Sequence, residues 1–243
     1  MANPQLHPLE VNPKTGEPFL RLPAHKNIIL TPPRVSDGPF LVSIMNDERV
    51  YPWLTFPPHP YLPEHAESWL NRVIPETEKL LAELEDARND TTLKIVDGCP
   101  ARVIREVKED GTDIFLGEIW FGLSRHWWEL EGSGKASQET PRRDPNDPDI
   151  WMVGDYLASS HHGQGIMSDA FNTLLRQWGI PRMGVQRMVV STFEGNKGSC
   201  RVFEKMGFKF RKTIDNATEA RGAMRGVHVL EWTLEDEAKV ADK

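Results

Sequence analysis

The sequence predicts an α+β fold, built on a mixed, mostly antiparallel sheet that holds one parallel pair of strands. Residues 150–192 follow the order strand, helix, strand, and a crossover of this kind brings its two strands together in parallel. The flanking residues 101–123 and 208–234 each contain two successive strand patterns, which indicates antiparallel hairpins. Parallel pairing between antiparallel flanks makes the sheet mixed.

Short strands and helices are expected in the first part of the chain. Residues 28–34 form a short strand that ends at two prolines, and residues 36–47 carry apolar side chains at helical spacing. Residues 51–63 are too rich in proline for a helix or a central strand, so we expect a loop that covers the surface or forms one wall of a pocket. A longer helix follows over residues 64–86, broken or kinked near Pro75.

The middle of the chain has the pattern of strands followed by a long loop. Residues 92–96 are a short candidate strand, and an Asp-Gly turn joins residues 101–107 to residues 113–123 as a hairpin. Residues 129–149 are polar and rich in glycine and proline, which predicts a loop insertion. A loop of this length is either functional or a disordered insertion on the hairpin.

The last part of the chain returns to regular structure. The expected elements are a strand over residues 150–158, a helix over 166–178 that ends before Pro181, a strand over 187–192, a helix over 199–206, and closing strands over 208–214 and 226–234.

Composition sets the broad class of the protein. The chain has 243 residues, 39% of them apolar, and a formal net charge of −7. We expect one domain over residues 28–236, an extended proline-rich arm over residues 1–27 and a tail over residues 237–243. The acidic balance argues against nucleic-acid binding, and the lack of a long apolar run argues against a membrane span. Two distant cysteines and no signal-peptide pattern favour a cytoplasmic protein without a zinc site.

The stretch "HHGQGIM" (His161–Met167) places two glycines between a predicted strand and a predicted helix. The first backbone amides of a helix lack partners and carry partial positive charge, so an anion can bind there if no side chain blocks its approach. Gly163 and Gly165 remove that block, which predicts a phosphate site. The alternative is a turn that only lets the strand and the helix pack closely. The adjacent His161 and His162 are not expected to bind a metal, because no third ligand is apparent.

Two motifs, "YLASSHHGQGIMSDA" and "NKGSCRVFEKMGF", resemble the diagnostic motifs of the GNAT superfamily of acyl-CoA-dependent N-acetyltransferases. The most similar branch is the ribosomal-protein N-terminal acetyltransferase group, of the RimJ and RimL type. The resemblance covers most of the chain, apart from residues 1–27 and 129–149. It implies a three-layer GNAT fold, with helices on both faces of the sheet and a central parallel pair of strands that splays apart.

The resemblance also implies acetyl-CoA as the co-substrate, without a metal. In the family, amides of the glycine-rich turn hold the pyrophosphate, the preceding strand pairs with the pantetheine arm, and the second motif contacts the cofactor farther along. The corresponding residues are His162, Gly163, Gln164, Gly165, Ile166 and Met167 for the pyrophosphate, Tyr156, Leu157 and Ala158 for the arm, and Asn196 and Phe203 beyond it. The family usually has arginine or glutamine in place of His162, so this histidine predicts a phosphate affinity that depends on pH.

Acetyl transfer to an amine needs a base for the amine and a proton for the leaving thiolate. Many relatives use a tyrosine as the acid, but Phe203 stands at that place and has no proton to donate. Ser199 matches a serine that takes this role in the RimL-like branch, or it only caps its helix. Glu118 and Asp155 are strand carboxylates that could accept the amine proton directly or through a water, or could be solvated strand residues.

Aromatic residues are candidates for the acceptor site. They could line a pocket for an amine, or could be core and surface cover. The candidates are Trp53, Phe56 and Tyr61 in the proline-rich loop, and Trp120, Trp127 and Trp128 on a predicted strand. We expect a monomeric or homodimeric N-acetyltransferase that acts in a ternary complex on a primary amine, either a small molecule or a protein N-terminus. The alternative is a non-catalytic acyl-CoA-binding module, which the missing tyrosine favours.

Overall fold

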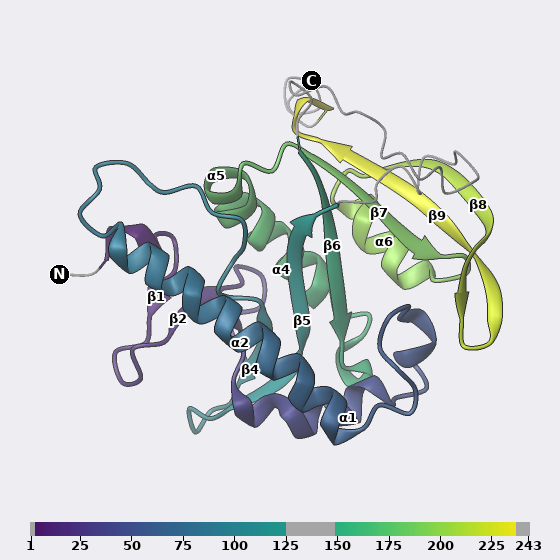
Figure 1. The fold of residues 1–243 in the computed structure, drawn as a ribbon, viewed down its shortest axis with the longest axis horizontal. Helices are drawn as coiled ribbons and strands as arrows, with labels where there is room; N and C mark the ends of the chain where they lie inside the picture. The colour runs from purple at the N-terminus through teal and green to yellow at the C-terminus, as the bar shows by residue number, and fades with distance from the viewer. Residues whose placement is uncertain (1–2, 125–148, 237–243) are drawn as a thin grey trace. The chain divides into compact units, whose positions relative to one another are not determined.

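The computed structural model describes residues 3–124 and 149–236, which group into two compact units (Figure 1). The first unit comprises the residues up to Trp120 together with Gly154–Gly184, and the second comprises Phe121–Val153 and the residues from Val185 onward. The predicted loop, apart from Asp149, and the predicted tail lie outside the described residues. A single domain over residues 28–236 stays a prediction.

The first unit is built on antiparallel strands in the order β1-β2-β3-β4-β5. β5 and β6 each have residues in both units. The strands are β1 (Glu10–Val11), β2 (Pro18–Arg21), β3 (Ile28–Thr31), β4 (Val103–Val107), β5 (Asp113–Leu123) and β6 (Ile150–Leu157). The helices of this unit are α1 (Gly38–Met45), α2 (Pro63–Asp86), α4 (Ile166–Leu174) and α5 (Ile180–Met183).

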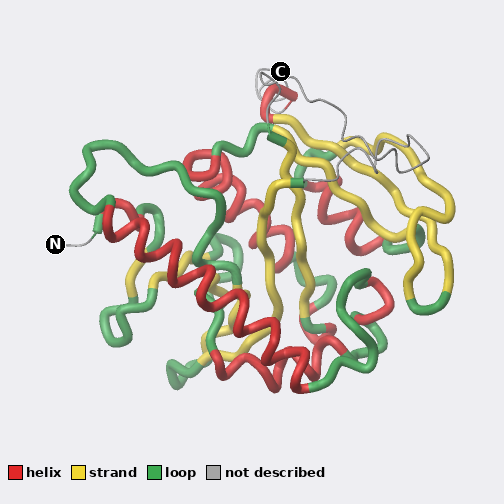
Figure 2. Tube along the Cα trace, in the orientation of Figure 1, coloured by secondary structure: helices red, strands yellow, loops and turns green. Residues whose placement is uncertain are grey.

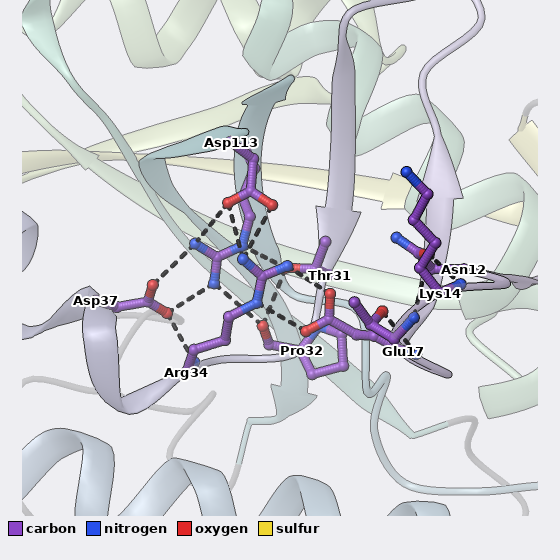
Figure 3. A network of polar contacts seen from close by, with 10 residues as sticks. Asn12, Lys14, Glu17, Thr31, Pro32, Arg34, Asp37 and Asp113 are labelled. Carbon is purple, nitrogen blue, oxygen red and sulfur yellow. Dashed lines mark hydrogen bonds and ion pairs between the residues drawn. The ribbon is translucent and has the colours of Figure 1, made fainter. Parts of the chain in front are cut away.

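The residues before β3 contain structure that the sequence does not predict. β2 pairs with β3, and its residues Phe19 and Leu20 are buried. Arg34 connects this segment to β5, because its guanidinium donates to Glu17 at 2.8 Å and to Asp113 at 2.8 Å (Figure 3). The arm is therefore part of the sheet, and apolar burial and ion pairs both hold it there.

A second, buried ion pair lies next to this one in Figure 3. The Arg105 guanidinium donates to both carboxylate oxygens of Asp37, at 2.8 and 2.9 Å, and its Nε donates to Thr31 at 2.7 Å. The side chains of Arg105 and Asp37 are only 2% and 1% exposed. Such a bidentate pair replaces the water that both charges lose on folding, and it connects β4 to the start of α1.

Helices α1 and α2 pack together against one face of the strands. Their apolar residues form a cluster with Val103 of β4, Phe115 of β5 and Tyr156 of β6. Figure 1 shows α2 crossing in front of the strands of this unit, whereas α4 lies behind β5. Of the two alternatives predicted at Pro75, a break is wrong, since α2 contains Pro75 and is one continuous helix (Figure 2). A kink at Pro75 stays a prediction. A proline is tolerated inside a long helix whose apolar face is fixed by tertiary packing.

The segment after the glycine-rich turn differs from the prediction at its end. The helix does not stop at Trp178 but continues through a π-helical turn, Leu175–Gly179, into α5. Pro181 is the second residue of α5, directly after the π turn, and Gly184 ends the helix at φ 69°. The extra residue of the π turn keeps Trp178 fully buried, with its indole N–H on the Gly98 carbonyl at 2.8 Å.

The predicted strand over residues 92–96 is wrong, because this segment has no ladder partner. Its backbone is satisfied by other groups instead. The side chain of Gln5 bonds the carbonyl of Thr92 and the amide of Lys94, and the amide of Val96 donates to the Arg182 carbonyl at 2.8 Å. Polar side chains thus take over the hydrogen bonds that a strand would make.

The second unit carries the parallel pair that the sequence predicts. β6 pairs in parallel with β7 (Arg187–Phe193) at Ile150↔Arg187 and Trp151↔Met188, and the order continues as β7-β9-β8 in antiparallel fashion. The remaining elements are α6 (Lys197–Lys205), β8 (Lys209–Ala220) and β9 (Ala223–Thr233). The predicted mixed, mostly antiparallel sheet is confirmed. β8 and β9 are joined by a tighter turn than predicted, with Gly222 at φ 74°.

Candidate active site

The glycine-rich turn lies between β6 and α4 in the first unit. Gly163 and Gly165 have φ angles of 75° and 83°, in the left-handed region that glycine adopts without strain. Gly165 is the N-cap residue of α4, and Ile166 and Met167 directly after it are buried. The glycines thus let the chain reverse into a helix whose first residues are fixed in the core.

The backbone amides of this turn point to an anion. Among the residues that the structure describes, no hydrogen-bond acceptor is found for the amides of Gly163, Gln164, Gly165, Ile166 and Met167. No side chain caps the first amides of α4, and Asp169 in its first turn is the carboxylate nearest its positive end. A diphosphate offers several anionic oxygens to such a set of donors.

His162 is arranged differently from its neighbours. Its amide donates to the Ser159 carbonyl at 3.2 Å, and its ring Nε2 lies 2.8 Å from the Leu157 carbonyl. Both groups are therefore engaged within the protein. Of the six residues predicted to bind phosphate, the five from Gly163 to Met167 have amides for which no acceptor is found among the described residues. Among the described residues, no three side chains are grouped in a way that could hold a metal ion.

The predicted pantetheine segment is the end of β6 and the residue after it. Leu157 is buried, Tyr156 and Ala158 are half-buried, and Ala158 donates its amide to the Leu116 carbonyl at 2.6 Å. Gly117 of β5 lies against this segment, since a Cβ at Gly117 would meet the Tyr156 carbonyl oxygen at 2.1 Å. Only glycine fits at this approach of two backbones.

Glu118 is a buried carboxylate beside an arginine and two tyrosines. Its side chain is 2% exposed; one oxygen lies 2.5 Å from Nε of Arg102, and the other accepts a hydrogen bond of 3.3 Å from the Tyr156 hydroxyl. Burial raises the pKa of Glu118, and the charge of Arg102 opposes that rise. A carboxylate with a raised pKa is suited to take a proton near neutral pH.

The other candidate base, Asp155, lies on the opposite face. Side chains alternate along a strand, so Asp155 points away from the face that carries Tyr156 and Glu118. Asp155 is half-buried, and no hydrogen bond to its carboxylate is found within the described residues. Burial raises its pKa to about 6. The structure therefore separates the two predicted carboxylates.

Aromatic residues surround Glu118 and Arg102. The Arg102 guanidinium lies 5.6 Å from the ring centre of Trp120 and 5.7 Å from that of Trp69, and Trp120 packs over Gly154. Tyr61 is buried, and burial together with the negative charge of Glu118 raises its pKa. Tyr61 was predicted as a pocket residue, whereas Arg102 and Trp69 were missed as site residues. The one available signal for them was an arginine beside an apolar strand.

Two aromatic candidates from the proline-rich loop lie nearer the surface. Trp53 is 36% exposed and Phe56 is 89% exposed. Within the described part of the chain, no contact joins Phe56 to Glu118 or Trp120. Trp120 lies beside the candidate base, because its ring faces the Arg102 guanidinium that pairs with Glu118. Trp127 and Trp128 lie outside the described residues.

The candidates of the second motif belong to the second unit. Asn196 caps α6, since its side-chain oxygen accepts the amide of Ser199 at 3.1 Å. Ser199 is half-buried and is not the capping residue. Phe203 is buried and packs on Phe208, with ring centres 5.2 Å apart. These positions remain candidates for contact with the cofactor.

The mixed sheet and the glycine-rich turn before α4 are features of an acyltransferase. Residues 27–209 match the family described as the acetyltransferase (GNAT) domain, so the chain belongs to the GNAT acetyltransferase family. No curated protein matches the chain in sequence.

Solved structures show the same fold at low sequence identity. Mycobacterium smegmatis RimJ, in complex with a CoA disulfide, is 20% identical with a TM-score of 0.56, covering 90% of this chain and 88% of its own. RimL, a ribosomal L7/L12 alpha-N-protein acetyltransferase in complex with coenzyme A, is 14% identical with a TM-score of 0.55, covering 88% of this chain and 98% of its own. The microcin C7 self-immunity acetyltransferase MccE, in complex with acetyl-CoA and AMP, is 16% identical with a TM-score of 0.54, covering 86% of this chain and 93% of its own.

Proposed function

We propose that this acyltransferase moves the acetyl group of acetyl-CoA to a primary amine in a ternary complex. The observation that carries the proposal is the set of five backbone amides from Gly163 to Met167, which lack a protein acceptor at the start of α4. A site of this kind binds the diphosphate of coenzyme A without any metal or lysine. RimJ, RimL and MccE have the same fold, and their structures were solved with a CoA disulfide, coenzyme A or acetyl-CoA. These bound molecules support the choice of acetyl-CoA as the co-substrate.

The pantetheine arm of acetyl-CoA is assigned to other residues than the diphosphate. We propose that the pantetheine arm pairs with the backbone of Tyr156, Leu157 and Ala158, and that Asn196 and Phe203 contact it farther along. Asn196 keeps a side-chain amide N–H for this purpose, because capping α6 uses only its oxygen.

The chemistry requires one proton acceptor and one proton donor. The lone pair of the amine nitrogen attacks the thioester carbonyl carbon, the C–S bond breaks, and the amine proton passes to the Glu118 carboxylate directly or through a water. The Ser199 hydroxyl gives its proton to the departing thiolate and regains one from solvent. Glu118 is the preferred base because it lies with Tyr156, Arg102 and Trp120 on one face, whereas Asp155 points to the other.

The acceptor is proposed as a primary amine presented beside Trp120, with Trp53 and Phe56 as further contacts. Both kinds of acceptor predicted from the sequence stay in the proposal, a protein N-terminus and a small molecule. Ribosomal-protein and microcin-immunity acetyltransferases among the similar structures are consistent with either. We propose a cytoplasmic enzyme, because Cys99 and Cys200 are both free thiols. A monomer or a homodimer stays part of the proposal. No helix among the described residues is long and apolar enough to span a membrane.

The test is release of free CoA thiol from acetyl-CoA by the full chain, against a panel of amines and short peptides. Turnover that depends on both the acceptor and Glu118 is the expected result. Phe203, which cannot act as an acid, favours the second candidate, a non-catalytic acyl-CoA-binding module. Tight binding of acetyl-CoA without turnover on any acceptor would establish the module, and the absence of any binding would remove both.

A further inference from the structure

His25, in the segment before β3, reaches the glycine-rich turn. Its ring Nδ1 lies 2.8 Å from a carboxylate oxygen of Asp169 in α4, and its Nε2 lies 3.0 Å from the carbonyl oxygen of Gln164 in the turn. Asp169 also accepts the amide of Ala24 at 3.0 Å. The ring packs on Gly165, since a Cβ placed there would lie 3.8 Å from Cε1 of His25.

The two partners of His25 determine how its ring is protonated. A carboxylate and a carbonyl oxygen only accept hydrogen bonds, and a neutral imidazole has a single N–H to offer. The imidazolium, with two N–H groups, is the form that satisfies both contacts. In agreement with this, the hydrogen bond to Asp169 raises the pKa of His25, burial partly opposes that rise, and the bond to Gln164 adds to it.

The bond from His25 to Gln164 also fixes the direction of the next amide. A trans peptide is planar, so the carbonyl of Gln164 and the N–H of Gly165 point in opposite directions. Holding the carbonyl on the His25 side turns the Gly165 N–H to the opposite side, and a cationic donor on the carbonyl strengthens that N–H as a donor. Gly165 is one of the five amides without a protein acceptor.

We propose that the His25 imidazolium is a positioning residue that aims the Gly165 amide at the diphosphate of coenzyme A and makes coenzyme A binding sensitive to pH. The inference rests on the proposed function of the turn. On deprotonation the ring keeps its N–H toward Asp169, because a bond to a carboxylate is the stronger one. Nε2 then faces the Gln164 oxygen with a lone pair. The hydrogen bond from His25 to the turn and the positive charge are therefore lost together.

Other ionisable groups near the turn are held by different contacts. Asp169 of α4 is the charged group that pairs with the ring, and Lys26 follows His25 in the chain. In the turn, Nε2 of His161 lies 3.5 Å from Glu106 of β4, and the His162 ring lies on the Leu157 carbonyl. His25 differs from these histidines because its two contacts connect the turn directly to α4.

The direction of the effect follows from the raised pKa. His25 is cationic at and below its ordinary pKa, so affinity is full there and falls as the pH rises through the raised value. An anionic ligand favours the cation further, so binding takes up protons in this range. The predicted loss in affinity on deprotonation is about two- to fivefold, typical of one cation acting on a partly exposed anion.

The experiment is calorimetric titration of coenzyme A into the full-length protein from pH 5.5 to 8.5, in two buffers of different ionisation enthalpy. His25→Gln removes the charge, and His7→Gln is the control, because the side chain of His7 is exposed in the same N-terminal segment. Each variant is compared with the wild type at the same pH, which cancels the titration of the ligand's own phosphate monoester. We expect His25→Gln to bind two- to fivefold more weakly than wild type at pH 6, equally at pH 8.5, and without the extra proton uptake.

A second variant, Asp169→Asn, keeps the inference testable if His25→Gln fails to fold. Asp169→Asn keeps the ring but removes the carboxylate, so the NMR titration of the His25 ring should shift to lower pH and the affinity profile should shift with it. Equal pH profiles for wild type and His25→Gln, or a ring that titrates no higher than an exposed histidine, would overturn the inference while leaving the turn as a coenzyme A site. A wild-type protein that binds no coenzyme A at any pH would instead overturn the proposed function.

Discussion

The hydroxyl of Tyr156 donates a hydrogen bond of 3.3 Å to the carboxylate of Glu118, which places these side chains of β6 and β5 on one face of the sheet. The neighbour of Tyr156, Asp155, therefore points to the other face. Burial and the Glu118 charge hold the pKa of Tyr156 well above its usual value, so its phenol stays a hydrogen-bond donor across the working range.

Glu118→Gln is expected to lower kcat by about 10²- to 10⁴-fold, the usual contribution of a general base. Asp155→Asn is the matched control, because it makes the same change of carboxylate to amide on the opposite face. The measurement is thiol release from acetyl-CoA with a saturating acceptor. Full kcat in Glu118→Gln, or an equal loss in both variants, would reject Glu118 as the base.

Asp155→Asn is expected to stabilise the fold at neutral pH. A carboxyl whose pKa rises from 3.8 to about 6 on folding binds protons more tightly in the folded state, so its ionisation destabilises the fold. The loss begins as the pH rises above about 4 and is complete above about 6. The full shift corresponds to about 3 kcal/mol, and partial exposure reduces our expectation to about 1–2 kcal/mol.

Urea unfolding at pH 4 and at pH 7.5 tests this prediction. The variant should match wild type at the lower pH and exceed its free energy of unfolding at the higher pH. Asp90→Asn, at an exposed position, supplies the comparison. A variant that matches wild type at pH 4 and is less stable than wild type at pH 7.5 would show that Asp155 makes a favourable contact as a carboxylate.

Gly163→Ala is expected to weaken coenzyme A binding by about 10- to 100-fold, through lost hydrogen bonds to charged oxygens. Gly163 has φ 75° with no atom within 4 Å of an added Cβ, and Gly111 has φ 82° with the same open surroundings. Both alanine variants should lose about 1–2 kcal/mol of stability from the left-handed backbone. Only the methyl group at residue 163 lies on the proposed phosphate seat, so an equal effect of both changes on affinity would contradict the assignment.

Arg105→Met is expected to destabilise the protein by about 3–5 kcal/mol, because it leaves the buried Asp37 carboxylate without its cation. The control is Arg21→Met, which breaks the Arg21–Glu10 pair, whose side chains are 58% and 50% exposed. That change should cost less than about 1 kcal/mol. Chemical denaturation compares the two, and similar losses would mean that burial does not govern the strength of these pairs.

Local sequence signals predicted the elements around the glycine-rich turn. At residues 150–178 the apolar pattern changes from strand to helix across Gly163 and Gly165, and the structure has β6 and α4 on either side. The end of that helix could not be predicted, because a π turn at Trp178 moves Pro181 into the first turn of another helix. Proline marks a helix end only when the helix before it is regular.

The neighbours of Glu118 could not be predicted, because they depend on strand register, which one sequence does not give. Arg102 reaches Glu118 because β4 pairs with β5 through an irregular register beside Gly117, and a shift by one residue would reverse the faces. The role of His25 was hidden for the same reason, since it lies far from Gln164 and Asp169 in the chain. The prolines of the first 27 residues also concealed β2, in which Pro18 is the first residue of the strand, a place where proline is tolerated.

Fragments for expression should be cut with the fully buried Arg182 in mind. Its Nη1 donates to the backbone oxygens of Gln5 and His7, both at 2.6 Å. A polypeptide trimmed to begin at residue 28 would remove these two acceptors, leave the buried guanidinium with only the Lys94 carbonyl among its hydrogen bonds in the described residues, and delete His25. The family match, residues 27–209, omits these contacts, so fragments for expression should keep the residues before 27.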